Sequence, residues 1–546
     1  MVLCVDLLWA PTTQRSLHNG GDIITPTVPF SGLQSDIASF LAGVGETAPG
    51  GTGCFVRLVE KLDPWMYGAV GDDVANDLAS IAKAVSRLGV ISKTIDFRNQ
   101  SFYCGPITVN EAALFTITEK DNIRVEGMPK IRVDNQLGTS PALQYTSIFE
   151  VIDSNDPYIE CHAISDSHDK SAPRGPVAVN FKNVSKTVRG GRVVALCEKG
   201  LGAFQTRRIK DAAIKRDPLD PTWHGVTYEV EVVDCEYGVR LVASGDGYQG
   251  RIKSLRAGRS FFPVGVNNHI CHIDSEAPEL ISDVLIKAYA DNVENIVVFL
   301  NQRNADGAAW PVTIEHQNNT GDTSITNIQL YLNITGRVNS RVFVTGETTK
   351  EYVRVGSVFN SSGTLQTSTT CITDNIFIRG APKSLGVVTG IRDPILNLPT
   401  ATTNPGRIFV DFIDTQRTTN GFTIINGGIF KAKAAGSLAT NPARVDLRDC
   451  YPSGGTFFVE THLNANFADN TMANSLSRGD LILLAMDSAG AGSIIGTTSI
   501  YSHARGTAPT VTFSVVSGTL VATGAGSTAS SAETNLCVQP LGGRFI

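Results

Sequence analysis

The stretch WMYGAVGDDVANDL, residues 65–78, gives the clearest indication of fold in this chain. Gly68 and Gly71 supply the backbone freedom that a tight turn needs. Asp77 stands directly before a run of apolar residues and is placed to cap the first turn of a helix with its carboxylate. The apolar residues of that run are Leu78, Ile81, Ala82, Val85 and Leu88. Because this spacing puts them on one helix face, the sequence predicts a short amphipathic helix after residue 77.

These residues resemble the opening motif of bacteriophage tailspikes and related pectate-lyase-like proteins. In that family the motif reads Phe-Gly-Ala-x-Gly-Asp-Gly-x-x-Asp-Asp-Thr, and a short amphipathic helix follows it. Here Asp73 stands where the family usually has a second glycine, Asn76 replaces the first paired aspartate, and Leu78 replaces the threonine. The family motif caps the first turn of a parallel β-helix. The resemblance therefore implies an all-β chain that forms a right-handed, single-stranded parallel β-helix.

The composition agrees with a chain built from many short strands. Charged residues make up 18% of the 546 residues, and there are 52 glycines. The net charge of −6 and the lack of a long basic run argue against nucleic-acid binding. No run of 18 apolar residues occurs, so we expect no membrane insertion. The ten cysteines are scattered without metal-site spacing, which predicts free thiols and no cofactor.

The central part of the chain repeats one pattern without a strict period. Short runs with alternating apolar residues recur, and examples are Ile148–Ile152, Val177–Phe181 and Thr227–Val233. Asn, Asp and Gly separate these runs and favour turns. Stacking such strands in coils buries one alternating face and leaves the other outside. A large antiparallel sandwich array is the alternative interpretation.

The predicted domain organisation has three parts. Residues 1–63 form a head and linker, residues 64–430 form the β-helix, and residues 431–546 form a C-terminal β-sandwich-like domain. The family resemblance implies that the head attaches to the virion. It also implies that the C-terminal domain locks three chains into a homotrimer or binds glycan, and the sequence does not choose between these roles.

The densest acidic group lies in the segment YEVEVVDCE, residues 228–236. Alternation puts Glu229 and Glu231 on one outer face, and Asp234 and Glu236 fall in the following turn. Glycoside hydrolysis needs two carboxylates roughly 5 to 10 Å apart, and adjacent like charges raise the pKa of one of them. These four residues are therefore catalytic candidates. The alternative is a solvated outer face with turn-capping acids.

A second group combines an acid, an arginine, aromatic rings and histidines. Asp246 joins the catalytic candidates, and Tyr248, Arg259 and His269 are candidates for substrate binding. Sugar sites combine stacking faces with bidentate donors and titratable groups. The order of an arginine, aromatic residues and then Asn-His also resembles some phage capsule depolymerases. His269 and His272 cannot share one strand face, so we expect at most one of them in a site.

Two weaker groups complete the candidates. Trp310 and Glu315 suit a sugar platform with an adjacent acid, although Trp310 suits a gap-filling role equally. The segment from Glu160 to His168 contains two histidines and two acids, but its spacing matches no specific metal site. We therefore expect no bound metal.

The family resemblance implies the function. It predicts a phage tailspike that recognises a bacterial capsule, exopolysaccharide or O-antigen and hydrolyses it with an Asp/Glu pair. The partners would be two further copies of the chain, a phage tail, baseplate or adaptor protein at the N-terminus, and the polysaccharide. The residues from Met1 to Ala10 include Asp6 and no basic residue, so we expect synthesis in the host cytoplasm without a signal peptide and location in the virion.

Two alternatives remain open on the same fold. One is a tail adhesin that binds glycan without cutting it. The other is a polysaccharide lyase, in which Tyr, His, Arg or Lys groups remove a proton next to a uronate. The Asn-Thr-Asp, Asp-Asp and Gly-His-Gly motifs of polygalacturonase-like enzymes do not occur together as a set, and the tryptophan strand of pectate lyases is not found. Calcium-dependent pectate cleavage is therefore disfavoured.

Overall fold

The protein is described from a computed structural model whose chain divides into two compact units, Met1–Val284 and Leu285–Ile546. Each unit is described by itself. The described residues are 7–107, 113–135, 146–165, 175–208, 217, 220–242, 245–278, 282–288, 291–303, 310–317, 323–335, 341–342, 348–349, 353–359, 372–379, 396–397, 407–410, 423–426, 429–435, 443–446, 455–466, 475–486, 491–505, 510–516, 519–525 and 533–545.

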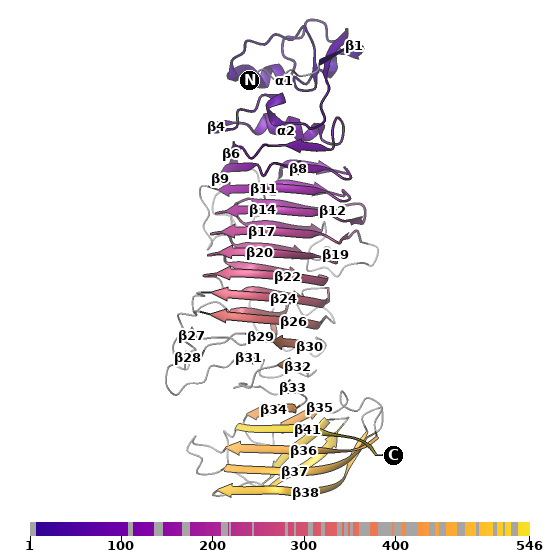
Figure 1. Cartoon of the computed structure of the whole chain (residues 1–546), viewed down its shortest axis with the longest axis vertical. Helices are drawn as coiled ribbons and strands as arrows, with labels where there is room; N and C mark the ends of the chain where they lie inside the picture. The colour runs from indigo at the N-terminus through magenta and orange to yellow at the C-terminus, as the bar shows by residue number, and fades with distance from the viewer. Residues whose placement is uncertain are drawn as a thin grey trace. The chain divides into compact units, whose positions relative to one another are not determined.

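Strands dominate the first unit, and its helical segments are short (Figure 1). The helices are α1 (Ile37–Leu41) and α2 (Leu78–Arg87), with 3-10 turns at Arg15–Leu17, Gln34–Asp36 and Pro64–Tyr67. The strands are β1 (Leu7–Gln14), β2 (Ile23–Ile24), β3 (Thr52–Arg57), β4 (Asp72–Asn76), β5 (Thr94–Asp96), β6 (Ser101–Ile107), β7 (Ala113–Thr118), β8 (Arg124–Glu126), β9 (Lys130–Asn135), β10 (Ser147–Ile152), β11 (Tyr158–Ser165), β12 (Val177–Asn183), β13 (Val188–Arg189), β14 (Arg192–Glu198), β15 (Gly202–Arg208), β16 (Trp223–His224), β17 (Thr227–Val233), β18 (Tyr237–Val242), β19 (Gly245–Asp246), β20 (Gln249–Leu255), β21 (Arg259–Val264) and β22 (Asn267–Glu276). Strand β23 (Ser282–Ala288) begins in the first unit and ends in the second.

The described part of the second unit consists almost entirely of strands. They are β24 (Val293–Arg303), β25 (Trp310–Gln317), β26 (Ser324–Thr335), β27 (Arg341–Val342), β28 (Thr348–Thr349), β29 (Val353–Phe359), β30 (Ile372–Arg379), β31 (Leu396–Asn397), β32 (Arg407–Val410), β33 (Thr423–Asn426), β34 (Ile429–Ala435), β35 (Ala443–Asp446), β36 (Gly455–Asn466), β37 (Ser475–Met486), β38 (Gly492–Arg505), β39 (Thr510–Val516), β40 (Thr519–Ala525) and β41 (Glu533–Phe545).

The N-terminal segment is joined to the start of the β-helix by a buried carboxylate. Strands β1, β3 and β2 form a small sheet, and Asp22 precedes β2. The Asp22 carboxylate is fully buried and accepts hydrogen bonds from Arg87 Nη2 at 2.7 Å and from the Tyr67 hydroxyl at 2.8 Å. Burial raises the pKa of Asp22, but the hydrogen bonds from Arg87 and Tyr67 outweigh it and hold this pKa below its usual value. An ionised Asp22 therefore ties the N-terminal segment to α2.

The opening motif folds as a tight turn followed by the predicted helix α2. Gly68 and Gly71 have φ values of 85° and 71°, and Asp73 has a φ of 61° at the position where the family usually has glycine. The expectation that Asp77 caps the helix with its carboxylate is wrong. That carboxylate is buried and accepts hydrogen bonds from Val70 N at 2.7 Å and Gly71 N at 3.0 Å, so it holds the turn and not the helix end.

The body of the first unit is a stack of parallel coils (Figure 1). Each coil gives one strand to a first sheet, ordered β7, β10, β12, β15, β18 and β21, and one to a second sheet, ordered β8, β11, β14, β17, β20 and β22. The short strands β13, β16 and β19 pair with one another between the two sheets. Every pairing within these sheets is parallel, which is the arrangement of a parallel β-helix.

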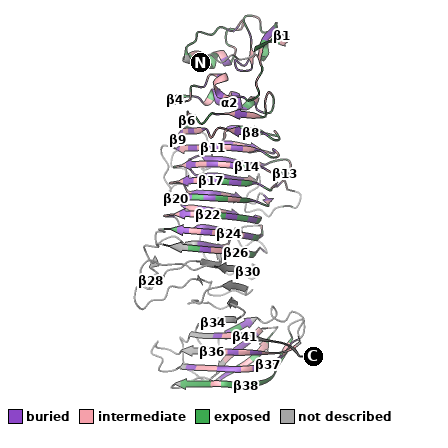
Figure 2. Cartoon of the chain, viewed as in Figure 1, coloured by how far each residue is buried: buried purple, intermediate pink, exposed green. Residues whose placement is uncertain are grey.

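The core of this unit is the space enclosed by the coils. Aligned side chains from successive coils fill it, and the aligned row Phe149, Val179, Phe204, Val239 and Phe261 is almost completely buried. Trp223 stacks on Phe181 with ring centroids 4.4 Å apart. Figure 2 shows buried and less buried residues alternating along these strands. This alternation is what the sequence pattern predicts when one face of each strand points inward.

The second unit contains parallel strands and a β-sandwich. Strands β24, β26, β30, β32 and β33 pair in parallel, and so do β25, β29 and β31. The antiparallel sheet β34-β41-β36-β37-β38 packs on the sheet β35-β40-β39. The core between them contains Val445, Val459, Leu463, Ile482, Leu484, Leu520, Leu536 and Val538. The predicted fold class, a parallel β-helix with a C-terminal β-sandwich, is confirmed, whereas the three domain boundaries stay predictions.

Among the described residues, no helix has both the length and the apolar character needed to cross a bilayer.

Candidate functional site

The first sheet presents an unusual outer face, which we call the first outer face. Its aligned row runs through Glu150, Asn180, Gln205, Arg240 and Phe262, one residue from each of five successive strands. Neighbouring residues in this row are about 4.8 Å apart along the stack. The face is completed by Tyr237 and Arg259, which start strands β18 and β21.

The side chains of the first outer face contact one another across the strands. The Asn180 amide donates a hydrogen bond to Glu150 Oε1 at 2.9 Å, and the Tyr237 hydroxyl donates to Gln205 Oε1 at 2.5 Å. The guanidinium carbons of Arg240 and Arg259 lie 5.6 Å and 5.1 Å from the centroid of the Phe262 ring. Amides, guanidinium groups and an aromatic ring therefore form a continuous row across these strands, in which Arg240, Arg259 and Phe262 are partly exposed.

Several of these polar groups are buried, and the Tyr237 ring packs in a core cluster with Val177 and Leu201. Asn180, Gln205 and Tyr237 are 4%, 2% and 2% exposed. The Asn180 Oδ1 atom is buried and accepts no hydrogen bond. A buried acceptor of this kind costs free energy unless a ligand or water satisfies it.

Glu236 lies at the edge of this face, in the turn between β17 and β18. Its carbonyl oxygen accepts a hydrogen bond from Arg259 N at 2.7 Å, which fixes the turn against the next coil. Burial raises the pKa of the Glu236 carboxyl, while the charges of Arg240 and Arg259 lower it, and the net pKa lies above the usual value. A carboxyl with a raised pKa can hold a proton where an ordinary glutamate has lost it, which is the requirement for a general acid.

Asp234 lies two residues earlier in the same turn and has a different environment. Its backbone has a φ of 55°, in the left-handed region. Arg256 donates to both carboxylate oxygens, from Nε and from Nη2, at 2.8 Å each. The turn therefore holds one ion-paired carboxylate and one half-buried carboxyl, and such a difference in environment gives two acids different roles in hydrolysis.

The second sheet presents a contrasting face, which we call the second outer face. Glu229 aligns with Arg251 and His272, and Glu231 aligns with Lys253 and Asp274. Glu231 Oε1 accepts from Lys253 Nζ at 2.7 Å, and these side chains are 43% and 63% exposed.

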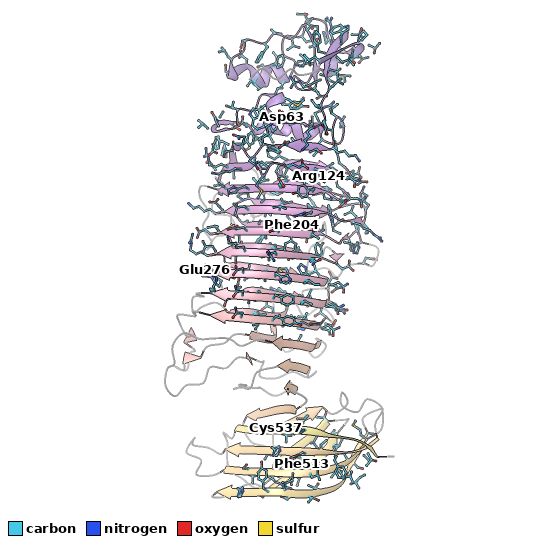
Figure 3. All side chains as sticks on the ribbon, in the orientation of Figure 1. Asp63, Arg124, Phe204, Glu276, Phe513 and Cys537 are labelled. Atoms are coloured by element: carbon cyan, nitrogen blue, oxygen red, sulfur yellow. The ribbon has the colours of Figure 1, made fainter. Side chains whose placement is uncertain are left out.

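The two glutamates share an outer face as predicted, but their catalytic role stays a prediction. Glu276 is the last residue of strand β22 in this sheet and is labelled in Figure 3.

Tyr248 and His269 lie inside the coils, which corrects the expectation that they bind substrate. They are 1% and 0% exposed. His269 Nε2 is 2.7 Å from the Tyr228 hydroxyl, and burial lowers the pKa of His269 to about 3. A polysaccharide on the surface cannot reach these rings. Buried residues alternate along β22 from His269 through Cys271 and Ile273, so His269 belongs to the inward face of that strand.

Asp246 lies at the corner between the two sheets, on the short strand β19. It contacts His224 of β16 through its Oδ1 atom and the imidazole Nδ1 atom, and the opposite imidazole nitrogen is 2.6 Å from the Thr222 hydroxyl. The His224 and Asp246 side chains are 34% and 41% exposed. The structure does not join this group to Glu236.

The remaining candidates are dispersed. In the second unit, Glu315 lies on β25 and is 3.1 Å from Lys287 Nζ, while the side chain of Trp310 lies outside the described part of the structure. In the first unit, Glu160 accepts from Met128 N at 2.9 Å, and His162 Nε2 is 2.7 Å from Glu198 Oε1.

The two other residues of the Glu160 group, Asp166 and His168, fall outside the described residues. Across the described ranges, His, Cys, Asp and Glu side chains form no cluster that would hold a metal ion.

Sequence reasoning selected Arg259 and Glu236 but missed five polar members of the first outer face, namely Glu150, Asn180, Gln205, Tyr237 and Arg240. They come from four strands of successive coils, β10, β12, β15 and β18. Only the register between coils brings them together, and turns of unequal length hide that register in the sequence. The one local signal was the polar residue in an otherwise apolar strand, such as Asn180 within VAVNF.

No family model and no curated protein matches this sequence. Solved structures that match include the tailspike protein of Acinetobacter baumannii phage AM24, with 13% identity, a TM-score of 0.30, and coverage of 98% of this chain and 91% of that chain. The tailspike of A. baumannii phage Fri1, described as a capsular polysaccharide depolymerase, has 11% identity, a TM-score of 0.30, and coverage of 98% and 94%.

A mutant tailspike of Escherichia coli phage HK620, in complex with a pentasaccharide, has 10% identity, a TM-score of 0.31, and coverage of 93% and 100%. These three matches are tailspikes, the class that the opening motif resembles. Because their TM-scores are low, the fold assignment rests on the strand pairings described above.

Proposed function

We propose that this chain is a phage tailspike that binds a bacterial surface polysaccharide on the first outer face and hydrolyses it there. The observation that carries the proposal is Glu236, a half-buried carboxyl with a raised pKa beside two arginines at the edge of that face. The opening motif and the parallel β-helix support the tailspike assignment. The partly exposed groups of that face support a glycan ligand, since the arginines Arg240 and Arg259 and the ring of Phe262 are of the kinds that bind sugars.

In the proposed reaction Glu236 is the general acid. It gives its proton to the glycosidic oxygen, the bond from that oxygen to the anomeric carbon breaks, and the ring develops oxocarbenium character. Asp234, ion-paired with Arg256 in the same turn, is the proposed second carboxylate. It would either direct a water molecule onto the anomeric carbon or attack that carbon itself. Arg240 and Arg259 would orient the saccharide through bidentate hydrogen bonds.

The assembly and location follow the same proposal. Three copies would associate, and the N-terminal segment would attach the trimer to the phage tail, baseplate or an adaptor protein. The C-terminal sandwich would stabilise the trimer or bind glycan. Unheated samples on an SDS gel test the assembly: a band at the mass of three chains supports it, and a monomer in native mass spectrometry contradicts it.

The test of activity uses the purified chain on polysaccharides from a panel of encapsulated and O-antigen-bearing bacteria. Mass spectrometry of the released fragments identifies the reaction. Fragments that have gained one water molecule per cleavage support hydrolysis. Fragments with an unsaturated uronate that absorbs in the ultraviolet identify a lyase, and binding without fragments identifies an adhesin.

Two glutamine variants connect that activity to the site. Glu236→Gln keeps the shape of the side chain but cannot donate the proton, so cleavage should be lost while binding to the polysaccharide remains. Glu231→Gln is the matched control, because Glu231 lies on the exposed second outer face and is paired with Lys253. Equal loss in both variants would contradict the assignment of Glu236.

A further inference from the structure

The corner between the two sheets contains a hydrogen-bonded chain of a hydroxyl, an imidazole and a carboxylate. Thr222 Oγ1 is 2.6 Å from His224 Nε2, and His224 Nδ1 contacts Asp246 Oδ1. A nucleophile bonded to a base that a third group orients is the arrangement used for acyl transfer. We propose that Thr222, His224 and Asp246 form an ester-hydrolysing site that removes small acyl groups, above all acetyl, from glycan hydroxyls.

The fold holds this chain in position from both sides. His224 and Asp246 are directly aligned partners on the parallel strands β16 and β19. Trp223, the residue before His224, is buried against Phe181, and its indole donates to Gly190 O at 2.8 Å. Because Trp223 points into the core, alternation directs His224 outward. The imidazole is thus fixed by its backbone and not only by its two partners.

The hydrogen-bond partners define the protonation pattern that the reaction needs. The carboxylate of Asp246 can only accept, so Nδ1 of His224 carries the proton, and Nε2 accepts from the Thr222 hydroxyl. Thr187 Oγ1 lies 3.5 Å from Thr222 Oγ1 and accepts from Thr222 N at 3.3 Å. Because the Thr222 hydroxyl donates to His224, the Thr187 hydroxyl is the donor in its contact with Thr222 Oγ1 and holds that oxygen in place.

The reaction balances with water as the second substrate. Thr222 Oγ1 attacks the acetyl carbonyl carbon while His224 Nε2 takes the hydroxyl proton. The ester C–O bond then breaks, and the sugar oxygen leaves with the proton from His224. Water next attacks the acyl-threonine with His224 as base, acetate leaves, and the Thr222 hydroxyl is restored. Asp246 is a positioning residue that holds the imidazole.

Burial limits the acyl group that can react. Thr222 is 8% exposed, whereas the His224 and Asp246 side chains are 34% and 41% exposed. A small acyl group can approach a nearly buried hydroxyl past a half-exposed imidazole, but a long chain cannot. Acetyl esters should therefore react, and butyryl or longer esters should not.

The test begins with the unaltered chain and 4-nitrophenyl acetate, followed by rapid acid quenching and peptide mass spectrometry. An acetyl group on the peptide that contains Thr222 supports the proposal. Acetylation confined to lysines elsewhere overturns it. Thr222→Val, which has nearly the same shape, should release nitrophenolate roughly 100-fold more slowly. Thr222→Ser should retain turnover and serves as the matched control for folding.

Asp246→Asn tests the positioning role. Turnover should fall roughly 100-fold, and the acidic limb of the rate profile should move to lower pH because no carboxylate then stabilises the imidazolium. A purely structural carboxylate would leave the profile of any residual activity in place. Unchanged rates in both Thr222→Val and Asp246→Asn would overturn the proposal.

The inference that the alcohol of this ester is a sugar rests on the proposed function. The acyl transfer at Thr222 does not depend on it. The two sites can therefore be separated on an O-acetylated polysaccharide. Glu236→Gln should still release acetate without shortening the chain, and Thr222→Val should still shorten it without releasing acetate. Loss of both activities in Thr222→Val alone would contradict a separate site.

Discussion

The first and second outer faces belong to the same coils, but their charged residues lie in different environments. On the second outer face, Glu231 and Lys253 are ion-paired and largely exposed, and Glu229 is exposed too. On the first outer face, Glu236 is half-buried beside Arg240 and Arg259, and burial raises its pKa. The comparison indicates that the environment of an acid, and not the number of acids nearby, distinguishes a candidate catalytic group from a solvated one.

The largest expected difference between the faces is in catalysis. Glu236→Gln should lower the rate of polysaccharide cleavage about 1,000-fold, since a general acid supplies a factor of roughly 100 to 10,000. Glu229→Gln removes a carboxylate from the same coil and should change the rate less than about twofold, because an exposed carboxylate has little effect on a distant reaction. Reducing-end assays under single-turnover conditions measure both rates. A larger loss in Glu229→Gln would reverse the comparison.

The next effect concerns the pH dependence of cleavage. Arg259 lowers the pKa of Glu236, so Arg259→Gln should raise that pKa further. The alkaline limb of the kcat profile, where Glu236 loses its proton, should therefore move to higher pH. Loss of a substrate contact should also reduce kcat/KM by about tenfold. Arg251→Gln on the second outer face is the control. An alkaline limb that moves equally in both variants would show that the limb does not report the titration of Glu236.

A smaller effect concerns stability. Because the pKa of Glu236 is higher in the folded chain, the unfolded chain loses this proton first as pH rises. Stability is therefore lost as pH rises from the unfolded pKa through the folded pKa. Glu236→Gln removes this penalty and should stabilise the fold near neutral pH by at most about 1 kcal/mol, after allowance for partial exposure.

Thermal unfolding at two pH values tests this expectation. The midpoint of Glu236→Gln should exceed that of the unaltered chain near neutral pH, and the two should coincide below about pH 4, where both states hold the proton. A higher midpoint at acidic pH only would contradict the raised pKa. A more stable but inactive variant would also indicate that this turn is maintained for function at the expense of stability.

Much of the fold was predictable, whereas the site was not. The opening motif and the alternating strands identified the β-helix, because both depend on residues that are close in sequence. Alternation within one strand also placed Glu229 and Glu231 on a common outer face. His269 was selected from the order of an arginine, aromatic residues and Asn-His, whereas alternation with the buried Cys271 and Ile273 puts it inside the coils.

The first outer face depends on alignment between coils. Asn180 aligns with Gln205, and Gln205 aligns with Arg240, only through inter-strand hydrogen bonds. One sequence does not reveal this register when the turns differ in length. The burial that raises the pKa of Glu236 is a property of the assembled coils as well, so no pattern within residues 228–236 distinguished Glu236 from its three acidic neighbours.

The smallest expected effect comes from the ion pair on the second outer face. Lys253→Met breaks the contact with Glu231, but both side chains are largely in solvent, so the free energy of unfolding should fall by no more than about 0.5 kcal/mol. Activity should stay within about twofold, since screening in water limits the reach of a lost charge. Thermal midpoints and cleavage rates measure these two quantities. A tenfold loss of activity with an unchanged midpoint would mean that the exposed face contacts the polysaccharide, and the distinction between the two faces would then fail.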